Sequence, residues 1–542
     1  MRLRTRLRNA LLLAGLVAAA PASAQTENLV NRLLDRIVAN EQEFLARMKR
    51  LQPILETYLQ ETAESGDAET PPTNDHYMLG RLDLSNGVGQ TPFLASSAFQ
   101  KRGGLLFFRK GGSGVFFPAG FAQMVVMDLD EFNRQTYEFE YVRREFLGDL
   151  RCLVFDVAPK NKKAAGKFIG RVWVEDKDYR VVRFNGTYTS SRSSAVFFHF
   201  DSWRLNVAPG LWVPASVYVE DENPSAQIGR KVRFKGQIRL WGYNAVRSSK
   251  LDELTGILID AQTPVQDQSG SKDVSPLESQ RSWKRQAEEN VIQRLEKSGL
   301  LAPKGEVDQV LGTVVSNLMV TNQIDLDVQC RVLLTTPLET FSIGRTIVIS
   351  RGLLDVLPDE ASLAVVLSDE LAHIALGHRT ETMYAFSDET MFADHEILSR
   401  LRFSRSPQEI EAAGKRAMQI LSNSPYKDKL SNAGLFLKAL ASRAPRLGNL
   451  IQANLGNRLA NANNLLRLAE LASRAPALDE NKMEQIAALP LGSRTKVDPW
   501  TNQITLIKTR PIALLSAREK MPFEVTPLAL HLTRVSSKPA RP

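Results

Sequence analysis

The chain has 542 residues and a mass of 60.4 kDa, which is too long for one ordinary hydrophobic core, so two or three domains are expected. Its 43% hydrophobic and 24% charged residues are typical of a globular protein and exclude disordered, fibrous and disulfide-rich classes. Its net charge of +9 is spread along the chain without a block of six like charges, and its two cysteines lack C-x-x-C spacing, so nucleic-acid binding, redox catalysis and a cysteine zinc site are not indicated.

Residues 1–24 have the pattern of an export signal. Arginines at positions 2, 4, 6 and 8 precede an apolar stretch, Ala10 to Ala20, that is too short to span a bilayer comfortably. The triplet ending at Ala24 is a small-x-small cleavage site, so the mature chain is expected to begin near Gln25. Because no apolar run of about 18 residues follows, and no cysteine stands at the cleavage point, we expect a periplasmic or secreted protein without a transmembrane anchor.

The N-terminal half is predicted to consist of a helical arm and a β domain. Residues from about Glu27 to Glu64 are rich in Leu, Glu, Arg and Ala, with apolar residues at helical spacing, and residues 25–75 are predicted to form the helical arm. Residues 76–248 contain short alternating apolar runs separated by Gly, Asn and Asp, which predicts an antiparallel sheet. The segment Ala261 to Pro276 is rich in Gln, Ser, Asp, Gly and Pro and lacks periodicity, and residues 249–280 are predicted to form a linker.

Part of the β region is similar to a known class of domain. The stretches Gly148–Asp156, Gly170–Asp176 and Tyr179–Phe184 resemble the antiparallel half-barrel of outer-membrane lipoprotein-sorting and carrier domains. The resemblance implies an acyl chain or a lipoprotein as the ligand of this domain. The alternative is that the aromatic residues of the region form an ordinary sheet core: Phe107, Phe108, Trp173, Phe197, Phe198 and Phe200.

The region 281–425 holds an altered metal-binding pattern on a predicted apolar helix, residues 357–378. The helix contains Asp369-Glu370-Leu371-Ala372-His373, where zinc proteases have H-E-x-x-H. At about 100° per residue, His373 lies about 40° from Asp369 and Glu370 about 100° from it, so two ligands and a general base still share one face. Since Asp359 and Ser362 fall within the same arc, a solvated stripe of an amphipathic helix is the alternative interpretation.

Two further blocks extend the pattern. Thr340 to Leu354 precedes the helix, and Ser404-Arg405 with Glu409 to Ala413 follows it. Together the three blocks resemble peptidase family M48, which includes the CAAX prenyl endopeptidases and the bacterial heat-shock-type metalloendopeptidases.

The M48 resemblance implies an α-rich α+β zincin-like domain with one zinc ion. On this resemblance Glu409 is the third zinc ligand beside Asp369 and His373, Glu370 is the catalytic base, and His378 is a histidine that does not bind the metal. The substrate would be an extended polypeptide paired with an edge strand formed by Thr346, Ile347, Val348, Ile349 and Ser350.

Two departures from the family pattern leave the activity open. Asp369 replaces the first zinc histidine, and Ala413 replaces an aspartate that orients the ligands. A second carboxylate ligand would make the bound ion a weaker Lewis acid, and loss of an orienting partner commonly costs about 10 to 100-fold in affinity or activity. His395 could supply a replacement ligand, although its Asp-His-Glu triplet also fits a solvated helix surface.

The sequence therefore supports two hypotheses. The first is an exported zinc metalloendopeptidase-like protein that acts on envelope polypeptides with an impaired or altered metal site. The alternative is an inactive pseudopeptidase that binds unfolded envelope polypeptide or lipoprotein as a chaperone or assembly factor. Both share one predicted fold class, an antiparallel β half-barrel followed by an α-rich metallopeptidase-like domain.

The region 426–542 is predicted to contain helical hairpins and a C-terminal strand pair. The sequence Leu440 to Pro445 recurs as Leu471 to Pro476, 31 residues later, and each copy closes an apolar helix at its proline. A chance repeat of a helix-stop sequence is the alternative interpretation. The strand pair is predicted around Asp498 to Ile507.

Overall fold

A computed structural model provides the three-dimensional description of the chain. It describes residues 20–63, 71–93, 118–161, 163–189, 198–221, 232–243, 276–380, 382, 385, 400–451, 453–461, 464–465, 467–479, 489–492, 494–507 and 523–535. Most of the predicted signal sequence, most of the predicted linker and His395 lie outside these ranges. The chain divides into two compact units, the first drawn from Met1–Arg50, Val125–Val213 and Leu530–Pro542, and the second from Leu51–Met124 and Pro214–Ala529.

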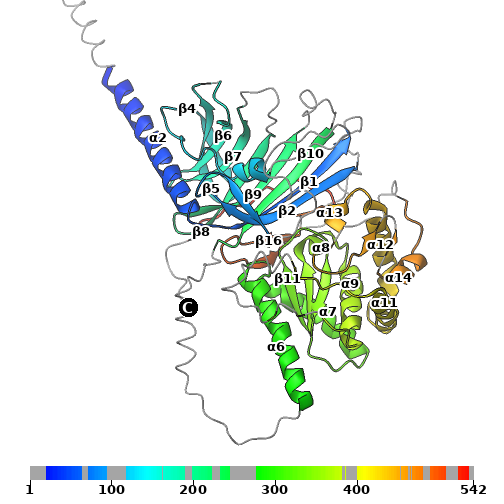
Figure 1. Cartoon of the computed structure of the whole chain (residues 1–542). Coiled ribbons are helices and arrows are strands. Elements are labelled where there is room, and N and C mark those ends of the chain that lie inside the picture. Colours follow the sequence, from blue (N-terminus) through cyan, green and yellow to red (C-terminus); the bar gives the residue numbers. More distant parts are fainter. Residues whose placement is uncertain are drawn as a thin grey trace, which may run out of the picture. The chain divides into compact units, whose positions relative to one another are not determined.

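An antiparallel sheet of ten strands forms much of the N-terminal half of the described chain (Figure 1). The strands are β1 (Ile54–Ala63), β2 (Asn74–Asp83), β3 (Gly89–Pro92), β4 (Tyr137–Leu147), β5 (Leu150–Pro159), β6 (Phe168–Glu175), β7 (Val181–Tyr188), β8 (Phe200–Ala208), β9 (Leu211–Asp221) and β10 (Val232–Trp241). Their order is β3-β2-β1-β10-β9-β8-β7-β6-β5-β4, so the sheet is not closed. The prediction of antiparallel β structure in this half is confirmed.

The helical arm is shorter than the sequence pattern indicated. Helix α2 (Ala20–Met48) ends before Pro53, and strand β1 follows within the range predicted to be helical. The glutamate and glutamine residues of β1 gave this stretch a helical composition. In the folded protein Glu56 and Gln60 are buried and hydrogen-bonded, so tertiary partners outweigh their helical propensity.

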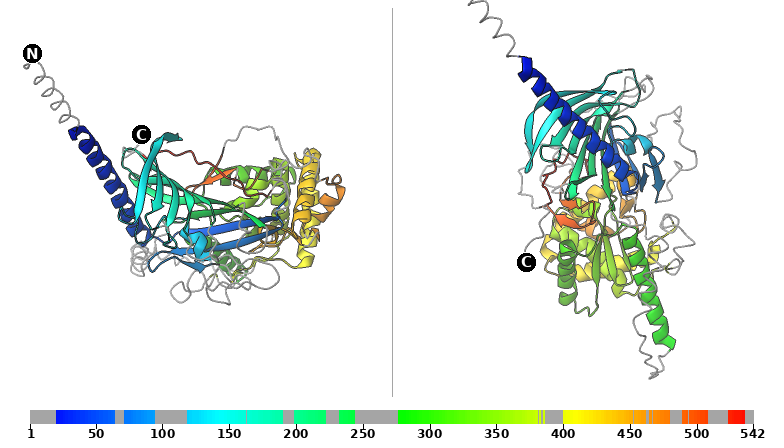
Figure 2. Two further views of the ribbon diagram at one scale, coloured as in Figure 1. Left: turned by 90° about the horizontal axis from the view of Figure 1, so that it is seen from above. Right: turned by 90° about the vertical axis from the view of Figure 1, so that its left-hand side faces the viewer.

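In the first unit, α2 lies beside the strands and runs obliquely to them in the right-hand view of Figure 2. Glu41 of α2 accepts two hydrogen bonds from the guanidinium of Arg204 on β8, at 2.6 and 2.8 Å, and both side chains are buried. That guanidinium lies 3.7 Å from the ring centre of Phe44 and 5.6 Å from that of Phe184. The helix is therefore connected to the sheet by a buried ion pair set between aromatic rings.

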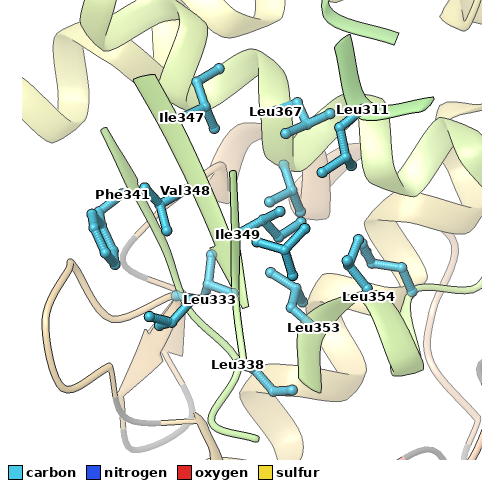
Figure 3. Close-up of a cluster of buried hydrophobic side chains, with 14 of the residues drawn as sticks. Leu311, Leu333, Leu338, Phe341, Ile347, Val348, Ile349, Leu353, Leu354 and Leu367 are labelled. Atoms are coloured by element: carbon cyan, nitrogen blue, oxygen red, sulfur yellow. The ribbon is translucent and has the colours of Figure 1, made fainter. Parts of the chain in front are cut away.

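The second unit contains a three-stranded sheet made by β11 (Gln329–Leu333), β12 (Thr340–Ile343) and β13 (Thr346–Ser350). The helices of this unit are α3 (Pro118–Gln123), α6 (Pro276–Lys297), α7 (Glu306–Thr321), α8 (Arg351–Val356), α9 (Glu360–Ala375), α11 (Pro407–Ser422), the 3-10 turn η1 (Lys427–Lys429), α12 (Leu430–Arg443), α13 (Gly448–Ile451) and α14 (Ala469–Arg474). Figure 3 shows Ile349 of β13 among leucines that include Leu311 of α7 and Leu367 of α9. No described helix is long and apolar enough to cross a membrane.

The predicted edge strand, Thr346 to Ser350, is corrected by the sheet order. This segment is β13, which lies in the middle of the order β11-β13-β12, parallel to β11 and antiparallel to β12. Both of its hydrogen-bonding sides are therefore occupied, and an extended substrate cannot pair with it. The pairing with β11 was missed because it is a contact between separate short strands, which periodicity does not reveal. The strand at the edge beside it is β12.

The C-terminal region contains two short hairpins and the repeated helix ends. The hairpins pair β14 (Ala460–Asn461) with β15 (Asn464–Leu465), and β16 (Thr495–Val497) with β17 (Ile504–Leu506). The two copies of the repeated hexapeptide lie at the ends of α12 and α14. These helices pack together, and Lys438 of α12 donates to the carbonyls of Ala475 and Pro476, both at 2.7 Å.

Candidate functional site

Helix α9 carries the altered metal-binding pattern in the interior of the second unit. Its N-cap is Asp359, whose carboxylate accepts a hydrogen bond from the Ser362 backbone N–H at 2.8 Å. Asp369, Glu370 and His373 are only 1%, 3% and 1% exposed, respectively. The interpretation of these residues as a solvated stripe is therefore wrong. Three polar side chains in an apolar core require partners.

The partner of the two acidic residues is Arg467, which follows the β14–β15 hairpin and is 1% exposed. Its Nε donates to Asp369 Oδ2 at 2.6 Å, and its Nη2 lies 2.5 Å from both Asp369 Oδ2 and Glu370 Oε1. Its Nη1 donates to the Thr340 carbonyl at 3.3 Å. A single buried guanidinium thus bridges the carboxylates of Asp369 and Glu370 and the backbone of β12.

Strand β12 supplies a further donor to Glu370. The Thr340 hydroxyl donates to Glu370 Oε1 at 2.8 Å, so this oxygen accepts from both Thr340 and Arg467. Burial acts to raise the pKa of Glu370, but the charge of Arg467, the neighbouring His373 and these hydrogen bonds lower it overall. Burial and the charge of Glu370 raise the pKa of Asp369 despite Arg467. Glu370 is thus stabilised as a carboxylate by charge and hydrogen bonds together.

His373 faces another histidine at the C-terminal end of the helix. Its Nδ1 lies 2.8 Å from Nδ1 of His378, so one of the two nitrogens carries the shared proton. Burial lowers the pKa of His373 to about 4, which leaves its ring neutral near pH 7. His373 Nε2 and Asp369 Oδ1 are both buried and have no hydrogen-bond partner among the described residues.

Glu409 lies at the start of α11 and caps that helix. Its Oε2 accepts hydrogen bonds from the backbone N–H and the hydroxyl of Ser406, both at 3.0 Å, while the Ser406 hydroxyl accepts from the Glu409 N–H at 3.3 Å. This reciprocal arrangement is a capping box. The Ser406 N–H, assisted by the Ser406 hydroxyl and the charges of His378 and Arg405, lowers the pKa of Glu409. Ala413, on the same helix, is buried in the core.

Side chains of other segments donate hydrogen bonds to the backbone carbonyls of the edge strand β12. Arg467 donates to the Thr340 carbonyl, and the Ser342 carbonyl accepts from Arg405 at 3.1 Å and from the Thr380 hydroxyl at 3.2 Å. Thr340 and Ser342 are two residues apart on a strand, so their carbonyls point to the same side. Acceptors that an added strand would use are therefore already engaged.

The residues present do not fit a metal ion in this arrangement. Two unpartnered buried atoms, His373 Nε2 and Asp369 Oδ1, have the chemistry of metal ligands. However, the positive charge of Arg467 already lies 2.5 Å from the carboxylate oxygens, and Glu409 is engaged in its capping box. Within the described ranges, no three His, Cys, Asp or Glu side chains are grouped so that they could hold a metal ion. The structure thus brings Asp369, Glu370 and His373 together but does not join Glu409 to them.

Sequence analysis missed Arg467, although a signal was present. Arg467 stands among three leucines, Leu465, Leu466 and Leu468. A lone arginine in an apolar run needs a buried carboxylate, and two adjacent acids in the apolar α9 need a cation. The two signals are about a hundred residues apart in the sequence, so only the fold shows that they belong together.

The first unit contains a separate hollow of about 1140 Å³. Many of its lining side chains are charged: Arg134, Glu138, Glu140, Asp156, Lys160, Arg171 and Arg183. Asp156 and Arg171 form a bidentate pair at 2.7 and 3.0 Å. The lining mixes these charged groups with apolar side chains, which include Leu34, Phe139, Ile169 and Trp173.

Residues 315–421 match the model of peptidase family M48. The matched range begins in α7 and ends in α11, and so contains the three-stranded sheet, α9 and Glu409. A comparison with the curated proteins found no match. The M48 resemblance predicted for the C-terminal half is therefore confirmed, and it indicates a metallopeptidase type of domain. The resemblance of the β region to lipoprotein carriers stays a prediction.

Proposed function

We propose, from the M48 match of residues 315–421, that this protein is a non-catalytic relative of the M48 metallopeptidases, a pseudopeptidase of the cell envelope. One observation carries the proposal: Arg467 is buried in contact with both Asp369 and Glu370. The guanidinium supplies the positive charge that a metal ion would otherwise bring to these two carboxylates.

The same contacts argue against base catalysis by Glu370. A general base must reach a water molecule with a free carboxylate oxygen. Glu370 Oε1 instead accepts from Arg467 and from Thr340, and its pKa is lowered, which makes it a weaker base. The side chain is also only 3% exposed, so burial limits the access of water to its other oxygen, Oε2.

The proposed ligand is an extended or unfolded envelope polypeptide that is bound without being cut. The family match supports a polypeptide as the partner, because the matched family consists of peptidases. The hollow of the first unit is the proposed binding surface. Its lining combines charged groups of both signs with apolar side chains, and this mixture suits a polypeptide that carries both kinds of side chain.

Metal content tests the loss of catalysis. Mass spectrometry of the purified protein is expected to find far less than one zinc per chain, and incubation with casein is expected to leave casein uncut. The informative pair of variants is Glu409→Ala and Glu411→Ala, since both glutamates lie on α11 but Glu411 pairs with Lys415 at the surface. About one zinc per chain, lost in Glu409→Ala and kept in Glu411→Ala, would contradict the proposal.

A metalloendopeptidase with an altered metal site is the second candidate. It is favoured by two atoms on one helix, Asp369 Oδ1 and His373 Nε2, which are buried without a hydrogen-bond partner in the part of the chain that the structure describes. On this hypothesis Asp369→His alone raises both zinc content and casein cleavage, since the histidine restores the missing ligand. The pseudopeptidase proposal expects no gain in either, because the charge of Arg467 remains. Zinc content and cleavage rate of this single variant separate the two candidates.

A further inference from the structure

We infer that a covering segment, made of residues 454–461, 464–465 and 467–468, is an internal occupant of the β12 edge, held there by Arg467. It takes the place where an extended polypeptide could otherwise pair. The inference deepens the proposed function and rests on it, since it names the segment that covers an edge with which a polypeptide could pair. Backbone contacts, side-chain contacts and burial of the described residues carry it.

The side chain of Glu339 brings the first part of the covering segment to the start of β12. Its carboxylate oxygen Oε2 accepts hydrogen bonds from the backbone N–H groups of Asn454 at 3.0 Å and Leu455 at 2.9 Å, and Glu339 is next to Thr340. Gly456 follows, and a Cβ placed on it would lie 2.8 Å from the Thr340 carbonyl oxygen. Glycine thus permits a close approach to the edge that a larger residue would prevent.

The residues before α11 hold the covering segment as well. The Phe403 N–H donates to the Leu455 carbonyl at 2.7 Å, and the Arg405 N–H donates to the Asn457 side chain at 2.9 Å. The ring of Phe403 also stacks on that of Phe341 in β12, with the ring centres 4.8 Å apart. The segment, β12 and the stretch before α11 therefore form one connected set of contacts.

Arg467 anchors the last part of the covering segment. Its guanidinium donates to the Thr340 carbonyl and is neutralised by Asp369 and Glu370 of α9. Apolar residues of the segment are buried: Leu455, Leu459, Ala460 and Leu468. Removing the charge anchor should therefore loosen a segment that is otherwise held by apolar packing and a few hydrogen bonds.

The occupied edge has a consequence for polypeptide binding. Addition of a strand to a sheet edge uses the backbone donors and acceptors of that edge. At β12 the Thr340 carbonyl accepts from Arg467 of the covering segment, and Gly456 of the same segment lies against it. An unfolded polypeptide can pair with β12 only after the covering segment leaves.

The test measures binding of fluorescently labelled casein to the full chain and to two variants that loosen the segment by different means. Arg467→Ala removes the anchor. Gly456→Leu leaves the ion cluster intact and forces the segment away from the Thr340 carbonyl. Arg474→Ala is the matched control, because Arg474 lies on α14 and pairs with Glu470 at the surface. Circular dichroism checks that each variant is folded, and Gly456→Ala replaces Gly456→Leu if the larger side chain prevents folding.

Both loosening variants are expected to bind casein at least about 10-fold more tightly than the wild type, equivalent to about 1.4 kcal/mol. In the Gly456 variant, hydrogen exchange should be faster in residues 454–461 and unchanged in α9. The inference is overturned if the folded Gly456 variant binds casein no more tightly than the wild type, whether or not its exchange rises. This result is distinct from failure of the proposed function, which is read from zinc and cleavage in the wild type.

Discussion

Three side chains, Arg467, Asp369 and Glu370, form a buried ion cluster. All three are at most 3% exposed, and the guanidinium contacts both carboxylates. A buried ion pair adds little net stability over apolar residues of the same shape, because both charges lose their water. Loss of one partner is different, since it leaves the other charges buried without compensation.

Arg467→Ala is therefore expected to lower the free energy of unfolding of the second unit by about 3–5 kcal/mol. Urea unfolding followed by circular dichroism measures the change. The control is again Arg474→Ala, which removes an exposed pair with Glu470 and should change stability by no more than about 1 kcal/mol. Equal losses in the two variants would show that Arg467 is not a buried anchor.

The sequence around Glu409 fits two interpretations, a metal ligand and part of a helix cap. The family pattern placed it there, yet Ser406 and Glu409 have the S-x-x-E spacing of a capping box at the start of a helix. Both interpretations use the same carboxylate. In the structure the capping hydrogen bonds engage it, and Pro407 at the first turn supports the same helix start.

Among the elements of the first unit, the loop before β4 is organised around one aspartate. Asp128 accepts hydrogen bonds from Tyr137 Oη at 2.7 Å, Lys167 Nζ at 2.9 Å, and the backbone N–H groups of Asp130 and Glu131, both at 3.1 Å. Burial acts to raise the pKa of Asp128, but Lys167 and the other donors lower it below its ordinary value. The side chain thereby joins the starts of β4 and β6.

The pH dependence of stability follows from the lowered pKa of Asp128. Because the folded pKa lies below the unfolded value of about 3.8, this contribution is present above pH 3.8 and is lost as the pH falls through the folded pKa. Asp128→Asn should lower stability at pH 7 by about 1.5–3 kcal/mol, and less as the pH approaches 2. Asp130→Asn, at an exposed neighbour, is the control.

Thermal unfolding of both variants and the wild type, followed across this pH range, measures the effect. A stability loss in Asp128→Asn that is as large near pH 2 as at pH 7 would mean that the ionised carboxylate is not the stabilising form. Hydrogen exchange of β4 and β6 would localise the change to the first unit.

Buried polar side chains on strands of the ten-stranded sheet form hydrogen bonds with other elements of the second unit. Glu56 of β1 accepts from the Thr336 N–H at 2.6 Å and from Arg351 of α8 at 3.1 Å. Asp75 of β2 accepts from the N–H groups of Asn449 at 2.9 Å and Leu450 at 2.7 Å. These contacts explain why β1 and β2 belong to the same compact unit as the M48-like range.

For the molecule as a whole, the boundary between units does not follow the sequence boundary between β and α regions. Sequence analysis divided the chain near residue 248, where composition changes. The structure assigns strands β1, β2, β3 and β10 to the second unit, together with the helices that follow them. A contiguous division by composition cannot show such an interleaved arrangement. Export, an envelope location and a polypeptide ligand remain parts of the proposal for the whole protein.

Local patterns were enough to predict the classes of structure in this protein. Periodicity predicted antiparallel strands in the first half and helices in the second, and three blocks between Thr340 and Ala413 indicated the M48 resemblance that the family model confirms. These signals are local, because each depends on residues within one strand, one helix or one short motif.

The residues and strands that surround the D-E-x-x-H motif are determined by long-range packing. The sequence could not show that β13 is a central strand, or that Arg467 meets Asp369 and Glu370 from 98 and 97 residues away. Such contacts depend on how distant segments pack, and no sequence pattern within one segment identifies the segment that it contacts. The state of the site is therefore a property of the fold: a buried charge is tolerated only where another segment supplies its counter-charge.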